Sequence, residues 1–221
     1  MLMLETIELE TAANPAIAII WLHGLGADGS DFVPMVGQFK AAGCPPIRFI
    51  FPHAPTMPVT VNNGYVMRAW YDILGPDLTR REDEAGVRAS QTAIEALIAA
   101  QIARGIASER ILLAGFSQGC AMTLQTGLRY PDKLAGMLCL SGYLPLSATV
   151  SAERSPANQN TPIFMAHGVM DPVVPLDRAI AARTTLEGLG YAVEWHDYPM
   201  PHSVCPQEVG DIGAWMMRVL R

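Results

Sequence analysis

Residues 111–119 read Ile-Leu-Leu-Ala-Gly-Phe-Ser-Gln-Gly, an apolar run that ends in the pattern Gly-x-Ser-x-Gly. The run has the length and composition of a buried strand, and a helical pattern follows it from Ser117 to just before Pro131. A sharp turn between a strand and a helix strains the serine backbone, and glycines beside the serine avoid steric clashes. Such a turn presents the hydroxyl at the carboxyl edge of a sheet, next to a helix N-terminus. The pattern predicts that Ser117 is a nucleophile.

Short apolar runs alternate with helical patterns on both sides of this stretch. Several runs are continuously apolar, which is typical of strands covered on both faces in a parallel sheet. The alternation predicts an α/β fold with right-handed crossovers, and the length suits a single domain over residues 1–221. The predicted strands are Thr6–Glu10, Ala16–Leu22, Ile47–Phe51, Ile111–Phe116, Gly136–Leu140, Ile163–Ala166 and Val193–Asp197. The predicted helices are Phe32–Ala42, Glu82–Arg104, residues 117–130, Leu176–Leu186 and Gln207–Leu220.

Two parts of this pattern carry more specific predictions. The second helix has one apolar stripe that we expect to face the core, formed by Val87, Ile94, Leu97, Ile98 and Ile102. The segment Pro52–Arg81 fits neither element type, and a loop of this length in a compact domain is usually functional. Its apolar residues, concentrated in Met57–Leu74, have three interpretations: a homodimer face, a lip that touches a membrane surface, or an acyl channel.

The composition excludes several classes of protein. The chain has 15 basic and 21 acidic side chains, a net charge of −6 and a pI of about 5.3, which argues against nucleic-acid binding. The longest apolar run, Ala16–Leu22, is far shorter than the roughly 20 residues that span a bilayer, so we expect no integral membrane segment. The N-terminus lacks the basic start of a signal peptide, and the four cysteines are scattered. These features predict a cytoplasmic protein with reduced thiols.

A serine nucleophile needs a histidine base, and the order Ser, acid, His is typical of α/β sheets with this turn. Of the histidines after Ser117, His202 lies in a loop between the last strand and the last helix, at the expected edge of the sheet. His196 lies within a predicted strand, and His167 precedes every reasonable acid, so we interpret both as structural. The sequence therefore predicts His202 as the base.

The histidine in turn needs a carboxylate that fixes its tautomer. Asp171 follows the strand Ile163–Ala166 directly and precedes His202 by 31 residues, which makes it the predicted acid. Three other aspartates lie between Ser117 and His202, and each has a simpler explanation. Asp132 lies in a turn, Asp177 begins a helix, and Asp197 ends a strand.

The glycine-rich loop after the first long strand, residues 21–29, supplies the second half of a predicted oxyanion hole. The backbone N–H groups of Leu25 and Gln118 are the predicted donors, while His23 braces the loop. The same loop matches Gly-x-Gly-x-x-Gly, a dinucleotide-binding pattern, but no acidic residue ends the next strand about 20 residues on. The nucleotide interpretation would also leave Ser117, Asp171 and His202 unexplained.

Four motifs in this order resemble the phospholipase/carboxylesterase family, which includes acyl-protein thioesterases, lysophospholipases and bacterial carboxylesterases. They are residues 23–32, residues 52–72, residues 115–119 and residues 202–205, and the likeness covers essentially the whole chain. The resemblance implies an α/β-hydrolase fold without a large cap domain. It also implies Ser117, Asp171 and His202 as a triad. The chain departs from the family at Cys120, where many members have glycine, and at Tyr71, where phenylalanine is frequent.

The resemblance also implies that residues 62–79 border an acyl-binding groove. Together with the apolar loop, it predicts that Trp70, Ile73 and Leu74 line an acyl channel, with Leu144 as a further wall. The alternative is that these side chains only pack the loop onto the body of the protein.

These observations predict a serine carboxylesterase that cleaves esters of short to medium acyl chains through an acyl-enzyme. The alternatives are an acyl-protein thioesterase or lysophospholipase, because each substrate presents the same carbonyl, and a non-catalytic binding protein. The expected partner is a small-molecule or lipid-derived acyl ester or thioester. We expect no cofactor and no metal, since the five histidines show no ligand spacing such as His-Glu-x-x-His.

Overall fold

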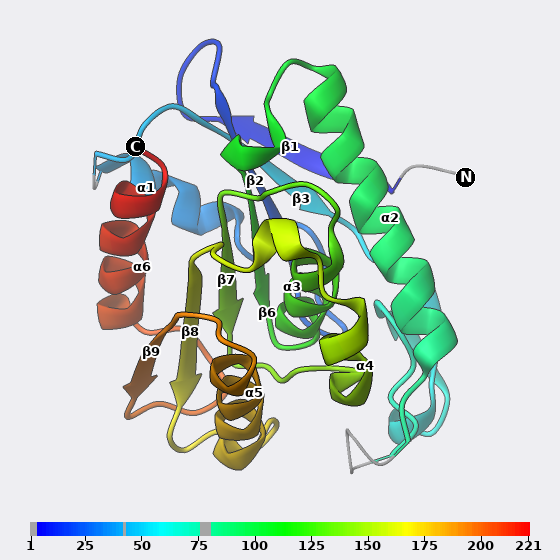
Figure 1. Ribbon diagram of the computed structural model, residues 1–221. Coiled ribbons are helices and arrows are strands. Elements are labelled where there is room, and N and C mark those ends of the chain that lie inside the picture. The colour runs from blue at the N-terminus through cyan, green and yellow to red at the C-terminus, as the bar shows by residue number, and fades with distance from the viewer. Residues whose placement is uncertain (1–3, 42, 76–80) are drawn as a thin grey trace.

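A computed structural model describes residues 4–41, 43–75 and 81–221. Within these ranges the chain forms a seven-stranded sheet with the order β1-β3-β2-β6-β7-β8-β9, in which every pair is parallel except β1 with β3 (Figure 1). The strands of this sheet are β1 (Thr6–Glu10), β2 (Ile17–Leu22), β3 (Ile47–Pro52), β6 (Ile111–Phe116), β7 (Gly136–Leu140), β8 (Ile163–Gly168) and β9 (Val193–Tyr198). The predicted α/β class and all seven predicted strands are confirmed, with ends that differ by at most two residues.

Helices cover both faces of the sheet, with α1 and α6 on one side and α2 and α3 on the other (Figure 1). The helices are α1 (Val36–Ala41), α2 (Glu84–Ala103), α3 (Gln118–Arg129), α4 (Ser147–Glu153), α5 (Leu176–Gly188) and α6 (Pro206–Val219). The position of β2 in the middle of the structure explains why its sequence is apolar throughout. Its residues Ile19 and Trp21 pack in one core cluster with α6, while Ile20 and Leu22 pack in a second cluster with α2. Both faces of the strand are therefore buried.

Some predicted elements differ from the structure. The predicted helix Phe32–Ala42 begins as a 3₁₀ turn at Val33–Met35, where Pro34 lacks a backbone donor, and only then becomes α1. The predicted stripe of α2 was wrong at Ile102, which is 38% exposed, while the polar Gln101 of the same last turn is buried in its place. Helix α4 was not predicted.

The segment Pro52–Arg81 is not the unstructured loop that its composition suggests. Its described part contains a two-stranded hairpin, β4 (Thr56–Val59) and β5 (Tyr65–Arg68), joined by a short 3₁₀ turn. At the end of this turn Asn63 and Gly64 both have positive φ, which asparagine and glycine tolerate best. The hairpin stands apart from the main sheet, next to the carboxyl ends of the central strands.

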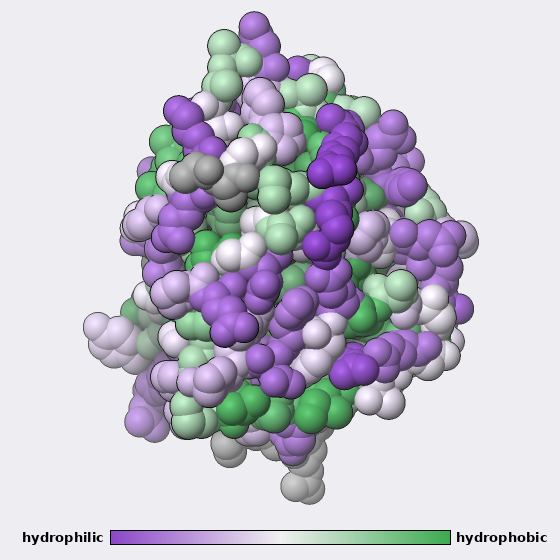
Figure 2. Space-filling model, turned by 90° about the vertical axis from the view of Figure 1, so that its left-hand side faces the viewer, coloured by the Kyte–Doolittle hydropathy of each residue, from purple (hydrophilic) through white to green (hydrophobic). Residues whose placement is uncertain are grey.

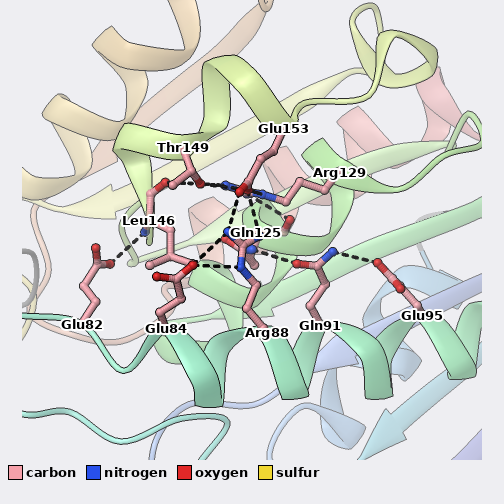
Figure 3. A network of polar contacts seen from close by, with 10 residues as sticks. All are labelled: Glu82, Glu84, Arg88, Gln91, Glu95, Gln125, Arg129, Leu146, Thr149 and Glu153. Atoms are coloured by element: carbon pink, nitrogen blue, oxygen red, sulfur yellow. Dashed lines mark hydrogen bonds and ion pairs between the residues drawn. The ribbon is translucent and has the colours of Figure 1, made fainter.

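A polar network joins α2, α3 and α4, and so fixes the helix that follows Ser117 (Figure 3). Arg88 of α2 and Arg129 of α3 each approach the Glu153 carboxylate of α4 to 2.6 Å. Between α3 and α2, the buried Gln125 amide donates to Gln91 Oε1 at 2.8 Å. In the part of the chain that the structure describes, no helix is both long and apolar enough to cross a membrane.

Candidate active site

The turn at Ser117 has the strained geometry that the sequence pattern predicts. The Ser117 backbone has φ 57° and ψ −118°, which side-chain-bearing residues rarely adopt. A Cβ atom at Gly115 would lie 2.2 Å from the Gly119 carbonyl oxygen, and one at Gly119 would lie 2.1 Å from the Leu22 carbonyl oxygen. Both glycines are therefore required by close backbone contacts. The Ser117 N–H donates to the Leu140 carbonyl at the end of β7, which ties the turn to the sheet.

The three predicted triad residues lie in one chain of hydrogen bonds. His202 Nε2 is 2.9 Å from Ser117 Oγ, and His202 Nδ1 is 2.6 Å from Asp171 Oδ2. The other Asp171 oxygen accepts the backbone N–H groups of Val173 and Val174 at 2.8 and 2.9 Å. These contacts place the Nδ1 proton between the ring and the carboxylate, so Nε2 is left to accept the serine proton. The geometry fits a nucleophile, a base and an orienting acid.

The other histidines have structural contacts. His167 is fully buried and its Nε2 lies 2.8 Å from the Val174 carbonyl oxygen, and burial lowers the pKa of its imidazole. His196 stacks on Phe164 at 4.7 Å and contacts the carboxylate of Glu194.

His23 braces the glycine-rich loop. Its Nδ1 contacts the Gly24 carbonyl at 2.7 Å, and its Nε2 accepts the Ala54 N–H at 3.0 Å. These bonds assign the ring proton to Nδ1, and burial lowers the pKa of His23, so the imidazole stays neutral. The ring therefore links the predicted oxyanion loop to the segment after β3.

The two predicted oxyanion donors border the same cavity as Ser117. Leu25 and Gln118 both line it, and among the described residues neither backbone N–H has an acceptor. A feature that the sequence did not reveal is the role of the Gln118 side chain. Its Oε1 accepts the Trp70 N–H at 2.8 Å, and its Nε2 donates to the Tyr71 carbonyl at 2.7 Å. The residue after the nucleophile thus clamps the segment that follows the hairpin.

The cavity over Ser117 has a volume of about 410 Å³, within the usual range for small-molecule sites. No charged side chain of the described ranges lines it. Its lining residues are mostly apolar: Leu25, Val61, Asn62, Ile73, Gly75, Ser117, Gln118, Tyr143, Pro172, Val173, Val174 and Pro175. Figure 2 shows apolar side chains gathered at the lower end of one face, the end at which the parallel strands of Figure 1 finish. The rim of the cavity is also apolar, since Val173, which lines the cavity, is 60% exposed.

The predicted acyl-channel residues have different positions. Ile73 lines the cavity. Leu74 borders only a narrow crevice beside it. Leu144 is buried among residues of the β7, β8 and α5 core, and it also borders a separate cavity of about 170 Å³ next to Tyr143. Trp70 is 1% exposed, and its indole N–H donates to the His23 carbonyl at 2.9 Å. Trp70 therefore packs the core, which is the alternative interpretation given above, whereas Leu144 as an acyl-channel wall stays a prediction.

The sequence missed several lining residues. Val61, Tyr143 and the run Pro172–Pro175 all border the cavity. The run follows Asp171 directly, so its position next to the predicted acid was a usable signal. Within the described part of the chain, no group of three His, Cys, Asp or Glu side chains is arranged to hold a metal ion.

A mostly parallel sheet flanked by helices, with a strained serine turn at its carboxyl edge, defines an α/β-hydrolase. The chain belongs to the phospholipase/carboxylesterase family, whose pattern it matches over residues 5–219. It is 41% identical over 218 residues to acyl-protein thioesterase 1 of Gibberella zeae, covering 95% of this chain and 93% of the relative. The relative of the same name in Neurospora crassa is 43% identical, with coverage of 90% and 86%.

Solved structures agree with this assignment. The crystal structure of Arabidopsis thaliana SOBER1 superposes with a TM-score of 0.86 at 34% identity, covering 93% of this chain and 99% of that one. The structure of Zea mays acyl-protein thioesterase 2 superposes with a TM-score of 0.85 at 25% identity, covering 98% and 99%. The chain thus matches a hydrolase family over residues 5–219.

Proposed function

We propose that this protein is a serine hydrolase that releases acyl chains from thioesters carried by proteins. The observation that carries the proposal is the hydrogen-bonded series Ser117–His202–Asp171 on the wall of an apolar cavity. The sequence alone favoured carboxylic esters as the main substrate and placed thioesters second. The sequence relatives named above favour the opposite order, because they carry the name acyl-protein thioesterase 1.

The reaction begins when Ser117 Oγ attacks the acyl carbonyl while His202 Nε2 accepts the hydroxyl proton. Asp171 keeps the imidazole in the required tautomer and stabilises the imidazolium that forms. The oxyanion lies against the N–H groups of Leu25 and Gln118, and each such donor contributes about 3–4 kcal/mol to transition-state stabilisation. His202 then protonates the leaving thiolate. Water attacks the acyl-enzyme by the same route and regenerates Ser117.

The cavity explains which part of the substrate is held. An uncharged acyl chain fits a lining with no charged side chain in the described ranges, whereas a charged peptide or phosphate group would lose its hydration there. The acyl chain therefore occupies the cavity, and the leaving group stays in solvent. The same geometry also accepts oxygen esters, since the acyl carbonyl is unchanged.

The proposal is tested with two matched peptides that carry the same acyl chain, one on cysteine and one on serine. We expect turnover of the thioester peptide with a kcat/KM at least about tenfold above that of the oxygen ester, and loss of both activities in Ser117→Ala. Turnover of the oxygen ester alone would indicate a carboxylesterase instead. Binding of both peptides without turnover would indicate the non-catalytic alternative.

A further inference from the structure

The hydroxyl groups of Tyr71 and Tyr143 form a pair that the proposed mechanism does not use. The two oxygens are 2.7 Å apart, and the residues are only 3% and 4% exposed. Tyr143 lines the cavity over Ser117. Both tyrosines also border the narrow crevice that shares Ile73 and Gly75 with that cavity. The pair therefore lies beside the main cavity, on the side where the crevice adjoins it. Tyr143 also lines a separate cavity of about 170 Å³.

Both rings are held in fixed positions relative to the nucleophile. The Tyr71 carbonyl accepts from the Gln118 side chain, one residue after Ser117. Tyr143 follows Gly142, at which a Cβ atom would lie 2.5 Å from Cys120 Cβ and 2.8 Å from the Ser117 carbonyl oxygen. The chain therefore passes directly against the start of α3 just before Tyr143. The segments that carry Tyr71 and Tyr143 are thus both tied to the start of α3, next to Ser117.

The pair has one more donor than it can use internally. Two phenols carry two O–H groups, and the bond between them uses one. Burial raises the pKa of both phenols, so both hydroxyls stay protonated at neutral pH. In the described ranges no second acceptor contacts either oxygen. One O–H is therefore left for water or for a ligand in the cavity.

We propose that the Tyr71–Tyr143 hydroxyl pair determines the acyl-chain length that the enzyme accepts, an inference that rests on the proposed hydrolase function. A short acyl chain leaves room for water that accepts the remaining O–H. An alkyl chain long enough to reach the pair displaces this water and offers no acceptor in return, so the donor is left buried and unpaired. The pair therefore disfavours long alkyl chains.

The test uses the double variant Tyr71→Phe/Tyr143→Phe, which removes both hydroxyls and keeps both rings. The readout is the ratio of kcat/KM for p-nitrophenyl decanoate to that for p-nitrophenyl butanoate, which a general loss of folded enzyme does not change. We expect the ratio to rise about tenfold, the effect of relieving one unpaired buried hydroxyl. Tyr130→Phe is the matched control, since Tyr130 is a buried tyrosine at the end of α3 that does not border the cavity. An unchanged ratio in the double variant would overturn the inference.

A binding measurement separates this inference from the proposed function. On a Ser117→Ala background, affinities are measured for methyl ketones of four and ten carbons, with and without the two phenylalanine substitutions. We expect the double substitution to strengthen binding of the longer ketone by about tenfold relative to the shorter one. If the wild-type protein cleaves neither thioesters nor oxygen esters but this shift occurs, the function fails and the selectivity stands. If esters are cleaved and neither ratio shifts, the hydroxyl pair has no role in selectivity.

Discussion

His167 occupies the position from which it can hold the predicted acid in place. Its Nε2–H donates to the Val174 carbonyl at 2.8 Å and lies 3.5 Å from Asp171 Oδ2. The N–H of the same Val174 donates to Asp171 Oδ1 at 2.9 Å. One residue of the loop thus has its carbonyl fixed by His167 and its amide fixed by Asp171. The imidazole acts on the orientation of Asp171 through this backbone contact.

Replacing His167 tests this positioning role. We expect His167→Phe to lower kcat by about 10- to 100-fold with little change in KM, because a shift of the acid misorients His202 without altering the cavity. His167→Gln keeps a donor near the position of Nε2 and is expected to recover most of the rate. A second readout is the far-downfield NMR signal of the proton between His202 and Asp171, which we expect to shift in the Phe variant only. Equal rates and unshifted signals in both variants would contradict the role.

Glu208, in the first turn of α6, is a buried acid with an unusual protonation state. Its side chain is fully buried, and neither oxygen reaches hydrogen-bonding geometry with a partner among the described residues. Burial raises the pKa of Glu208 to about 8, and the nearby Cys205 amide opposes this only in part. The folded protein therefore holds Glu208 in its neutral form at pH 7, whereas the unfolded chain ionises it near its ordinary pKa.

This difference predicts how stability depends on pH. Because the folded-state pKa lies above the unfolded one, the contribution of Glu208 is complete below about pH 4.5 and is lost as the pH rises to about 8. The variant Glu208→Gln cannot ionise, so we expect it to gain stability relative to the wild type across this interval, by roughly a few kcal/mol at most. Urea unfolding of both proteins at pH 4.5, 6.5 and 8.5 measures the difference. A difference independent of pH would show that Glu208 titrates normally in the fold.

At the scale of elements, the contact between α4 and the α2–α3 pair depends on one carboxylate. Glu153 accepts from Arg88, Arg129 and Thr149, and the Arg88 hydrogen bond is the main reason that its pKa falls to about 2. The Arg129 side chain is only 4% exposed, so its charge needs this partner more than a surface arginine would. The network shown in Figure 3 therefore stabilises the helix that begins at Ser117.

Removing the charge of Glu153 is expected to destabilise the fold. We expect Glu153→Gln to lower the free energy of unfolding by about 1–2 kcal/mol at pH 7, since the Arg129 cation loses its counter-charge. The folded pKa is depressed, so the stabilisation is present above about pH 4.5 and disappears as the pH falls toward 2. Glu187→Gln is the control, because the exposed Arg183–Glu187 pair within α5 contributes only about 0.2–0.5 kcal/mol. Equal effects of the two variants at pH 7 would contradict this account.

The strands of the main sheet and the helices that cover it were predictable because the polarity of their residues follows the burial of each position. A strand buried on both faces is apolar at every position, as β2 is. The hairpin β4–β5 was not predictable, because it is bonded outside the main sheet and leaves Tyr65 and Val66 exposed. Helix α4 was missed for a related reason. It is held by a charge network between distant segments rather than by an apolar stripe of its own.

At the scale of the whole molecule, the candidate site was predictable where its residues follow a fixed backbone turn or a fixed order along the chain. The strained turn of Ser117 and the order of acid and base along the chain identified three residues that the fold brings within hydrogen-bonding distance. The cavity wall was predicted less well. Trp70 and Ile73 are close neighbours in an apolar segment, yet only Ile73 faces the cavity. Which of two apolar side chains faces a cavity depends on long-range contacts such as the Gln118 clamp, which sequence periodicity does not encode.

The apolar content of this acidic chain has two roles in the folded molecule. Most of it fills the core clusters on the two faces of the sheet. A smaller part surrounds Ser117 at the carboxyl edge, where the described lining carries no charged side chain. The whole molecule thus places an apolar cavity at the point where the N-terminus of α3 and the strained Ser117 meet.

The most direct measurement is the site and rate of modification by a fluorophosphonate, followed by mass spectrometry of the intact protein and its peptides. We expect a single adduct on Ser117, its loss in Ser117→Ala, and a rate at least about 100-fold slower in His202→Ala. An adduct that persists in Ser117→Ala, or that forms on another residue, would contradict the assignment of Ser117 as the nucleophile.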